Sequence, residues 1–113
     1  MRVYVSIPIS GKDYDVQKEL AEKVKEQLES EGHQVVTPFE IITDRNTPVH
    51  YAMGKDIEVL LTCDAAIFLD GWNESKGCRL ERSACKIYGL KYYEVIELIL
   101  ELYVAYKEEW ENN

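Results

Sequence analysis

The stretch Ser75-x-Gly77-x-x-x-Glu81 combines a hydroxyl, a flexible backbone and an acid within seven positions of the chain. It follows an apolar run, and a helix is predicted from 77 to 88. Gly71, Ser75 and Gly77 could leave backbone N–H groups and a hydroxyl open to an anion at the start of that helix. The residues therefore suggest a carboxylate that acts beside a bound anionic group.

Glu81 is predicted to point into the protein. At about 100° per residue, the cations Arg79, Arg82 and Lys86 share one stripe that should face water. The opposite arc contains Glu81 together with Leu80, Ala84, Cys85, Ile87 and Tyr88. A carboxylate on a core-facing stripe is costly unless it is paired or lines a cavity, so Glu81 is a candidate for function, with a raised pKa. The alternative is a buried salt bridge or an acid that interacts with the helix dipole.

Composition favours a small domain with a small-molecule ligand. The 113 residues form one domain, and the 21 acidic against 13 basic residues give a net charge of -8. This charge disfavours nucleic acid and anionic membranes as partners. Cys63, Cys78 and Cys85 form no C-x-x-C pair, and with only two histidines they indicate neither disulfides nor a metal site, so no cofactor is expected. The N-terminus lacks a secretory signal, which makes the cytoplasm the expected location.

The first part of the chain alternates between strand and helix patterns. Strands are predicted over 2–9 and 34–37, where β-branched and aromatic residues concentrate. An amphipathic helix ending near Gly32 is predicted between them, from apolar residues at four-residue spacing: Val16, Leu20, Val24 and Leu28. The segment 38–46 has no period and suggests a mobile flap or pocket wall.

The second part continues the alternation. Thr47 looks like an N-cap with Pro48 at the first helical position, which predicts a helix that carries Asp56 in its middle, runs through Leu61 and is closed by Asp64. Residues 65–69 predict a buried strand, and 90–93 a short fourth strand. A C-terminal helix over 94–111 follows the core of 1–93 and is apolar over most of its circumference, which predicts a homodimer or larger homo-oligomer. Its expected contact residues are Tyr103, Tyr106 and Trp110.

This order of elements predicts an α/β protein: a three-layer, doubly wound parallel sheet of four to five strands, flavodoxin-like or Rossmann-like. Such sheets bind ligands beyond the carboxyl ends of their strands. Three loops should meet there, over 6–11, after Thr37, and over 70–77. Glu81 would then lie near the crevice where the fold places a ligand.

Three motifs in this order and spacing resemble the nucleoside 2-deoxyribosyltransferases and the related 2'-deoxynucleoside 5'-monophosphate N-glycosidases. They are Tyr4-Val-Ser-Ile-Pro-Ile-Ser-Gly11, Asp56-Ile-Glu-Val-Leu-Leu-Thr-Cys-Asp64, and Ser75-x-Gly77-x-x-x-Glu81. The similarity runs from residue 2 to about residue 91. It implies that Glu81 is a nucleophile that attacks the anomeric carbon of a deoxyribosyl group and expels the base. Water or a second base would then release the sugar.

The resemblance also implies roles for other residues. Asp56 matches an acid that helps to protonate or position the departing base, and its alternative is an ion pair with Lys55 or Arg45. Tyr4 matches a tyrosine that orients Glu81, and its alternative is an ordinary core tyrosine. The substrate would be bound by residues of the converging loops: Ser6, Ile7, Ser10, Gly11, Asp70, Trp72, Ser75 and Gly77.

Ser75 bears on the substrate class. Members that act on nucleosides tend to carry an acid six residues before the nucleophile, whereas those that act on monophosphates carry serine, which can donate to phosphate. Phosphate-binding relatives show serine and arginine where this chain has Pro8 and Ser10, so the expected cation is missing, unless Arg45 or Lys12 replaces it. Two other functions stay open: a nucleotide-sensing module without catalysis, and cleavage of a ribosyl bond in a dinucleotide such as NAD.

Overall fold

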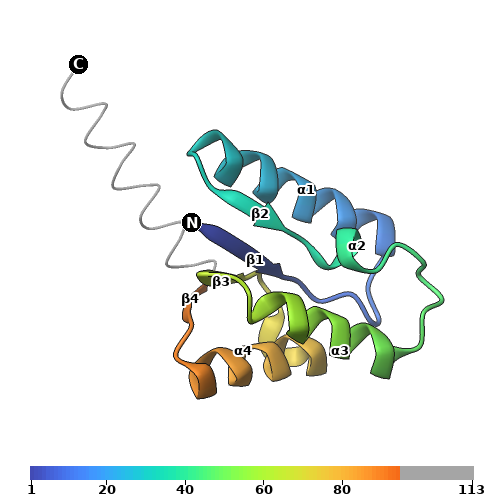
Figure 1. Cartoon of the computed structure of the whole chain (residues 1–113). Coiled ribbons are helices and arrows are strands. Elements are labelled where there is room, and N and C mark those ends of the chain that lie inside the picture. The colour runs from blue at the N-terminus through green and yellow to red at the C-terminus, as the bar shows by residue number, and fades with distance from the viewer. Residues whose placement is uncertain (95–113) are drawn as a thin grey trace.

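A four-stranded, all-parallel sheet forms the middle layer of the molecule (Figure 1). The computed structural model describes residues 1–94. The strands are β1 (Arg2–Ser6), β2 (Gln34–Val36), β3 (Ala65–Phe68) and β4 (Lys91–Glu94), in the spatial order β2-β1-β3-β4. At the carboxyl edge Ser6 lies opposite Phe68, and Phe68 lies opposite Glu94. The predicted α/β class with a parallel sheet is confirmed.

Helices cover both faces of this sheet (Figure 1). On one face lie α1 (Tyr14–Ser30) and the short α2 (Pro38–Ile41), and on the other lie α3 (Val49–Leu60) and α4 (Lys76–Tyr88). A 3-10 turn, η1 (Trp72–Glu74), precedes α4. The chain winds from β1 to β2 in one direction and then returns past β1 to β3 and β4, so the winding reverses between β1 and β3. In doubly wound sheets this reversal opens the ligand crevice.

Successive side chains of β1 point alternately into two cores, one on each face of the sheet. Val3 and Val5 pack in the cluster on the α1 side, where Ala21 and Leu28 also lie. Tyr4 packs in the cluster on the α3 and α4 side. Because successive side chains of a strand point to opposite faces, Tyr4 and Ser6 face the same two helices.

The buried stripe of α1 differs from the predicted one. Val16 is 58% exposed and Leu20 is 43% exposed, whereas Ala21 and Leu28 are buried and Val24 packs against the core. A four-residue spacing advances by about 40° per step around a helix with about 3.6 residues per turn. Four such residues therefore cannot all face the sheet, and only the later ones do.

The buried face of α4 is also narrower than predicted. Leu80, Ile87 and Tyr88 are exposed, while Cys78, Glu81, Ala84 and Cys85 are buried. Arg82, which was expected to face water with Arg79 and Lys86, is half-buried. The prediction that Glu81 points inward is confirmed, but fewer of the apolar residues around it are buried than predicted.

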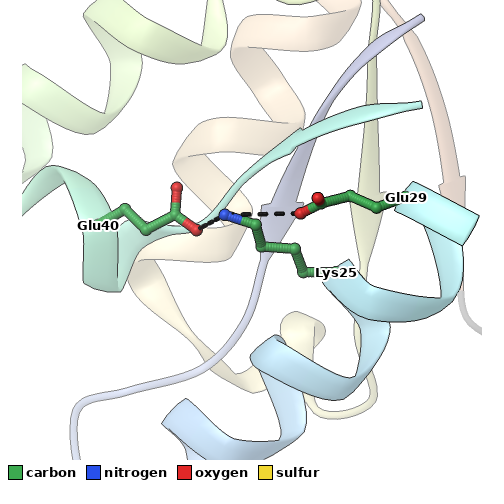
Figure 2. Close-up of polar contacts among 3 residues, drawn as sticks. All are labelled: Lys25, Glu29 and Glu40. Atoms are coloured by element: carbon green, nitrogen blue, oxygen red, sulfur yellow. Dashed lines mark hydrogen bonds and ion pairs between the residues drawn. The ribbon is translucent and has the colours of Figure 1, made fainter. Parts of the chain in front are cut away.

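The segment after β2 is folded over its first residues and is not a flap there. Pro38 begins α2, and Phe39 is buried with its ring edge-to-face against Tyr14, at 5.2 Å between centroids. Lys25 of α1 pairs with Glu40 of α2 and lies 3.6 Å from a carboxylate oxygen of Glu29 (Figure 2). Proline at the first helical position presets the backbone for this turn, which the absence of a period could not reveal.

Several element boundaries also differ from the predictions: β1 ends at Ser6 and not at residue 9, and α3 ends at Leu60 and not at Asp64. Pro48 occupies the N-cap position of α3, and the Thr47 hydroxyl instead donates to the backbone oxygen of Asp44. Glu94 is the last residue of β4 and not the start of the predicted C-terminal helix, whose remainder lies outside the described residues. Within residues 1–94, no helix has the length and apolar character needed to cross a bilayer.

Candidate active site

Glu81 is enclosed by the protein and has no cationic partner among the described residues. Glu81 is 4% exposed, and its Oε1 accepts a hydrogen bond of 3.0 Å from Ser6 Oγ. Its Oε2 is buried without a hydrogen-bond partner in residues 1–94. The pKa of Glu81 is raised to about 7, chiefly by burial and also by the charge of Asp56, against the lowering effect of the Tyr4 hydroxyl and of the Ser6 hydrogen bond. The expected raised pKa, partly offset by Tyr4, is confirmed.

Asp56 is a second buried acid in the same region, contributed by the middle of α3. It is 8% exposed, and burial raises its pKa to about 6. The alternative ion pairs are not formed, because Lys55 pairs with Glu58 at 3.2 Å and the Arg45 guanidinium lies over the Tyr14 ring. Within the described residues Asp56 makes no salt bridge, and its Oδ1 has no hydrogen-bond partner. Two carboxyl groups thus share one protected region without a compensating cation.

Tyr4 lies beside both acids from the central strand β1. Its side chain is fully buried, and desolvation followed by the charges of Glu81 and Asp56 raises its pKa well above the ordinary value. The hydroxyl interacts with Glu81 closely enough to lower the pKa of that acid, yet it lies outside normal hydrogen-bond geometry and has no other partner in residues 1–94. A purely structural tyrosine in a core would satisfy its hydroxyl.

The start of α4 is shaped by Ser75 and Gly77. The Ser75 hydroxyl accepts the backbone N–H of Cys78 at 3.2 Å and so caps the helix. At Gly77 an added Cβ would stand 3.2 Å from Met53 Sδ of α3, so glycine allows the two helices to approach here. Met53 was missed in the sequence, although it lies three residues before Asp56 and therefore on the same face of α3.

The loops after β1 and β3 meet at the carboxyl edge of the sheet, as predicted. An added Cβ at Gly71, where φ is +88°, would lie 3.4 Å from Pro8 Cγ. Ser10 and Gly11 are exposed in the first loop, and Asp70 is exposed in the loop after β3.

Ile7 does not belong with the site. It is buried in the cluster on the α1 side of the sheet, away from the face that Tyr4 shares with α3 and α4. The strand alternation that places Tyr4 and Ser6 beside Glu81 also turns Ile7 to the other face.

An arginine stacked between two aromatic rings fixes the loop that carries Trp72. The Arg82 guanidinium carbon lies 4.5 Å from the Trp72 ring centroid and 5.0 Å from that of Tyr92. Its Nη2 also lies 3.3 Å from Glu94 Oε1. This arrangement joins η1, α4 and β4 directly beside Glu81. Sequence reasoning missed it, because helical periodicity alone placed Arg82 among the solvent-facing cations.

Access to Glu81 is restricted in this structure. Two hollows on the described surface lie elsewhere: one along α1, with Lys25 and Glu40 in its lining, and one at the other end of the sheet, with Met1 and His33. Residues 1–94 contain no cluster of three side chains suited to hold a metal ion.

Comparison with known proteins places the chain in a family. Residues 1–93 match the model named "Domain of unknown function (DUF4406)". A solved structure of a 2-deoxyribosyltransferase from the psychrotolerant bacterium Bacillus psychrosaccharolyticus superposes with a TM-score of 0.64 at 19% identity, over 83% of this chain and 71% of that one. No curated protein matches the chain. The fold expected from the resemblance is confirmed: the chain belongs to the DUF4406 family and has the fold of a 2-deoxyribosyltransferase.

Proposed function

We propose that this chain is an enzyme that cleaves or transfers the N-glycosidic bond of a 2'-deoxynucleoside or its 5'-monophosphate. A Glu81 oxygen would attack C1' of the sugar, and the bonding electrons would leave with the base. Water or a second base would then attack C1' and restore the free carboxylate. The observation that carries this proposal is the enclosed Glu81, whose Oε2 has no partner in the described residues.

The two acids support a division of roles in that reaction. Glu81 must be ionised to attack, and Asp56 must be protonated to give a proton to the departing base. Their pKa values of about 7 and about 6 imply that near neutral pH the pair holds about one proton. Because the pKa of Glu81 is the higher of the two, that proton lies mainly on Glu81 in the free protein, and the reactive arrangement, with the proton on Asp56, is the minor one. Tyr4 supports it, because its hydroxyl interacts with the ionised form of Glu81.

A monophosphate is the favoured form of the substrate. The Ser75 oxygen accepts the Cys78 N–H, which leaves the hydroxyl proton available for a phosphate oxygen at the start of α4. Arg45 can supply the missing cation, because within the described residues it has no carboxylate partner and lies over the Tyr14 ring at 4.6 Å. Lys12 in the first loop is the other candidate for this role.

The test is incubation of the protein with each deoxynucleoside and each deoxynucleoside monophosphate, followed by chromatography for the free base. Glu81→Gln should abolish release, and Glu74→Gln, which changes an exposed glutamate in the preceding turn, should not. Mass spectrometry of the intact protein should detect the glycosyl adduct on the unsubstituted chain alone. If no substrate releases a base and Glu81→Gln binds nucleotides as the parent does, the enzymatic proposal is wrong.

A nucleotide-sensing module is the second candidate. The enclosure of Glu81, which is 4% exposed, favours it, because the acid is little accessible to a sugar in this structure. Such a module would bind a nucleotide without forming products. Calorimetric binding that is unchanged by Glu81→Gln, with no free base released, would decide in its favour.

We also propose that the protein is a cytoplasmic homodimer or larger homo-oligomer. The proposal rests on the apolar sequence of 94–111, of which 95–111 lies outside the described residues. Light scattering coupled to size exclusion should give at least twice the mass of one chain. Trp110→Glu should reduce the mass to that of one chain, since a charge in an apolar contact is costly. An unchanged mass for this variant would contradict the assigned contact.

A further inference from the structure

We propose that Ser6 is a positioning residue that holds Glu81 Oε1, so that Oε2 is the oxygen that attacks the sugar. This inference rests on the proposed function, but it assigns Ser6 a task other than the substrate binding expected from the sequence. It also distinguishes the two carboxylate oxygens of Glu81. The inference is based on the 3.0 Å hydrogen bond that Ser6 Oγ donates to Glu81 Oε1.

The backbone of Ser6 is held by its pairing with β3. Ser6 is the last residue of β1, at the point where the winding of the sheet reverses, and it pairs in register with Phe68. Its carbonyl oxygen accepts the backbone N–H of Leu69 at 2.9 Å. The residue has 0% exposure. A hydroxyl on a buried, paired strand is a more rigid anchor than one on a loop.

Ser6 cannot donate a hydrogen bond to Glu81 and to the substrate at the same time. A serine hydroxyl has one proton, and an ionised carboxylate can only accept hydrogen bonds. When Glu81 is ionised, the Ser6 proton is therefore committed to Oε1. Ser6 has no further proton to offer a sugar or phosphate oxygen, whereas Ser75 does.

The two oxygens of Glu81 consequently differ in reactivity. Oε1 gives electron density to the Ser6 hydrogen bond, and Oε2 is buried with no partner in residues 1–94. A nucleophilic oxygen loses reactivity when a donor binds it, and the rotation of the carboxylate is limited when one oxygen is held. Ser6 thus directs Oε2 to C1' and lowers the pKa of Glu81, so that more of the acid is ionised near neutral pH.

The experiment compares Ser6→Ala and Ser6→Cys with Ser83→Ala, which removes a hydroxyl from the exposed face of α4. Loss of a hydrogen bond to a charged group should lower kcat roughly tenfold to a hundredfold, while KM stays within about twofold. The acid limb of the pH profile should move to higher pH. Cysteine matches the size of serine but is a weak donor, so Ser6→Cys should resemble Ser6→Ala, and Ser83→Ala should resemble the parent.

A second readout needs no turnover. Carbon-13 NMR of the Glu81 carboxyl should show a higher pKa in Ser6→Ala and Ser6→Cys than in the parent. If the parent releases no base, the proposed function fails, yet this titration still decides whether Ser6 acts on Glu81. An unchanged Glu81 pKa, or a raised KM with an unchanged kcat, would overturn the inference. If Ser6→Ala does not fold, Ser6→Cys carries the same two expectations.

Discussion

The chemistry of the site depends on two acids that are buried without a cation among the described residues. Pairing with lysine or arginine would lower both pKa values and leave neither acid protonated near neutral pH. Here burial dominates and raises the pKa of Glu81 to about 7 and that of Asp56 to about 6. Near neutral pH the pair can therefore hold one carboxylate and one carboxylic acid, which are the two forms that the proposed reaction needs.

The pH dependence of the rate tests this division of roles. The profile of kcat/KM should be bell-shaped, with apparent pKa values near 6 and 7 that belong to the coupled pair. The rate falls at low pH because Glu81 gains a proton, and at high pH because Asp56 loses one. Asp56→Asn should lower the rate and remove the alkaline limb. The acid limb should not move to lower pH, because Asp56 is already protonated, and therefore neutral, in the active form. An alkaline limb that persists in Asp56→Asn would assign the proton to another group.

Ser75 allows a test of substrate class at little cost in stability. Ser75→Asp keeps a side-chain oxygen at the N-cap of α4, so the melting temperature should stay close to that of the parent, whereas Ser75→Ala should lose about 1 kcal/mol. The added negative charge should repel a phosphate, and use of monophosphates should fall roughly tenfold or more against the matching nucleosides. Competition assays with both substrates measure the ratio. An unchanged ratio would place the phosphate elsewhere.

Helical phase was enough to predict that Glu81 points inward, whereas Asp56 and Tyr4 were grouped with it only because three ordered motifs resemble a known family. The partner of Glu81 Oε1 could not be predicted. Ser6 is separated from Glu81 by 75 positions, and only the register of β1 against β3 brings the two side chains together. A sequence pattern reports the face of an element but not the distance between two elements.

Among the elements, the junction of η1, α4 and β4 is the least predictable from periodicity. Helical phase assigned Arg82 to water with Arg79 and Lys86, but Trp72 and Tyr92 extend over that edge of α4 and cover it. Val16 and Leu20 of α1 differ in the opposite sense. They were predicted to be buried, but they are exposed because the sheet does not reach their side of the helix. The parallel arrangement was predictable, because it follows from the alternation of strands and helices joined by right-handed crossovers.

The Arg82 stack predicts a specific difference between two cationic substitutions. Arg82→Lys keeps the charge but loses the planar group that lies between the two rings, so it should destabilise the protein by about 1 kcal/mol. Arg79→Lys, on the exposed side of the same helix, should change stability by less than about 0.5 kcal/mol. Urea denaturation followed by tryptophan fluorescence compares the two. Equal effects would mean that the stack contributes nothing beyond charge.

For the whole molecule, the buried acids predict that stability falls as pH rises. Glu81 has an ordinary pKa of 4.5 when unfolded and about 7 when folded. Between these pH values the unfolded chain has lost the proton and the folded chain still holds it, so the free energy of unfolding falls as pH rises. A difference of this size corresponds to about 3 kcal/mol, fully present below pH 4.5 and lost as pH rises through 7. Asp56 acts with the same sign, and the net charge of -8 adds repulsion.

The substitution that isolates this effect is Glu81→Gln, with Glu74→Gln as its matched control. Both remove one negative charge, but Glu74 is exposed in η1 and Glu81 is buried. Above pH 7, Glu81→Gln should melt at a higher temperature than the parent, because an ionised buried acid has been removed, whereas near pH 4.5 the two should melt alike. Glu74→Gln should follow the parent at every pH. Calorimetric scans across this range measure the difference, and parallel curves for all three proteins would show that Glu81 is not ionised in a protected site. The acid that makes the proposed reaction feasible is therefore also expected to weaken the fold at the pH where it works.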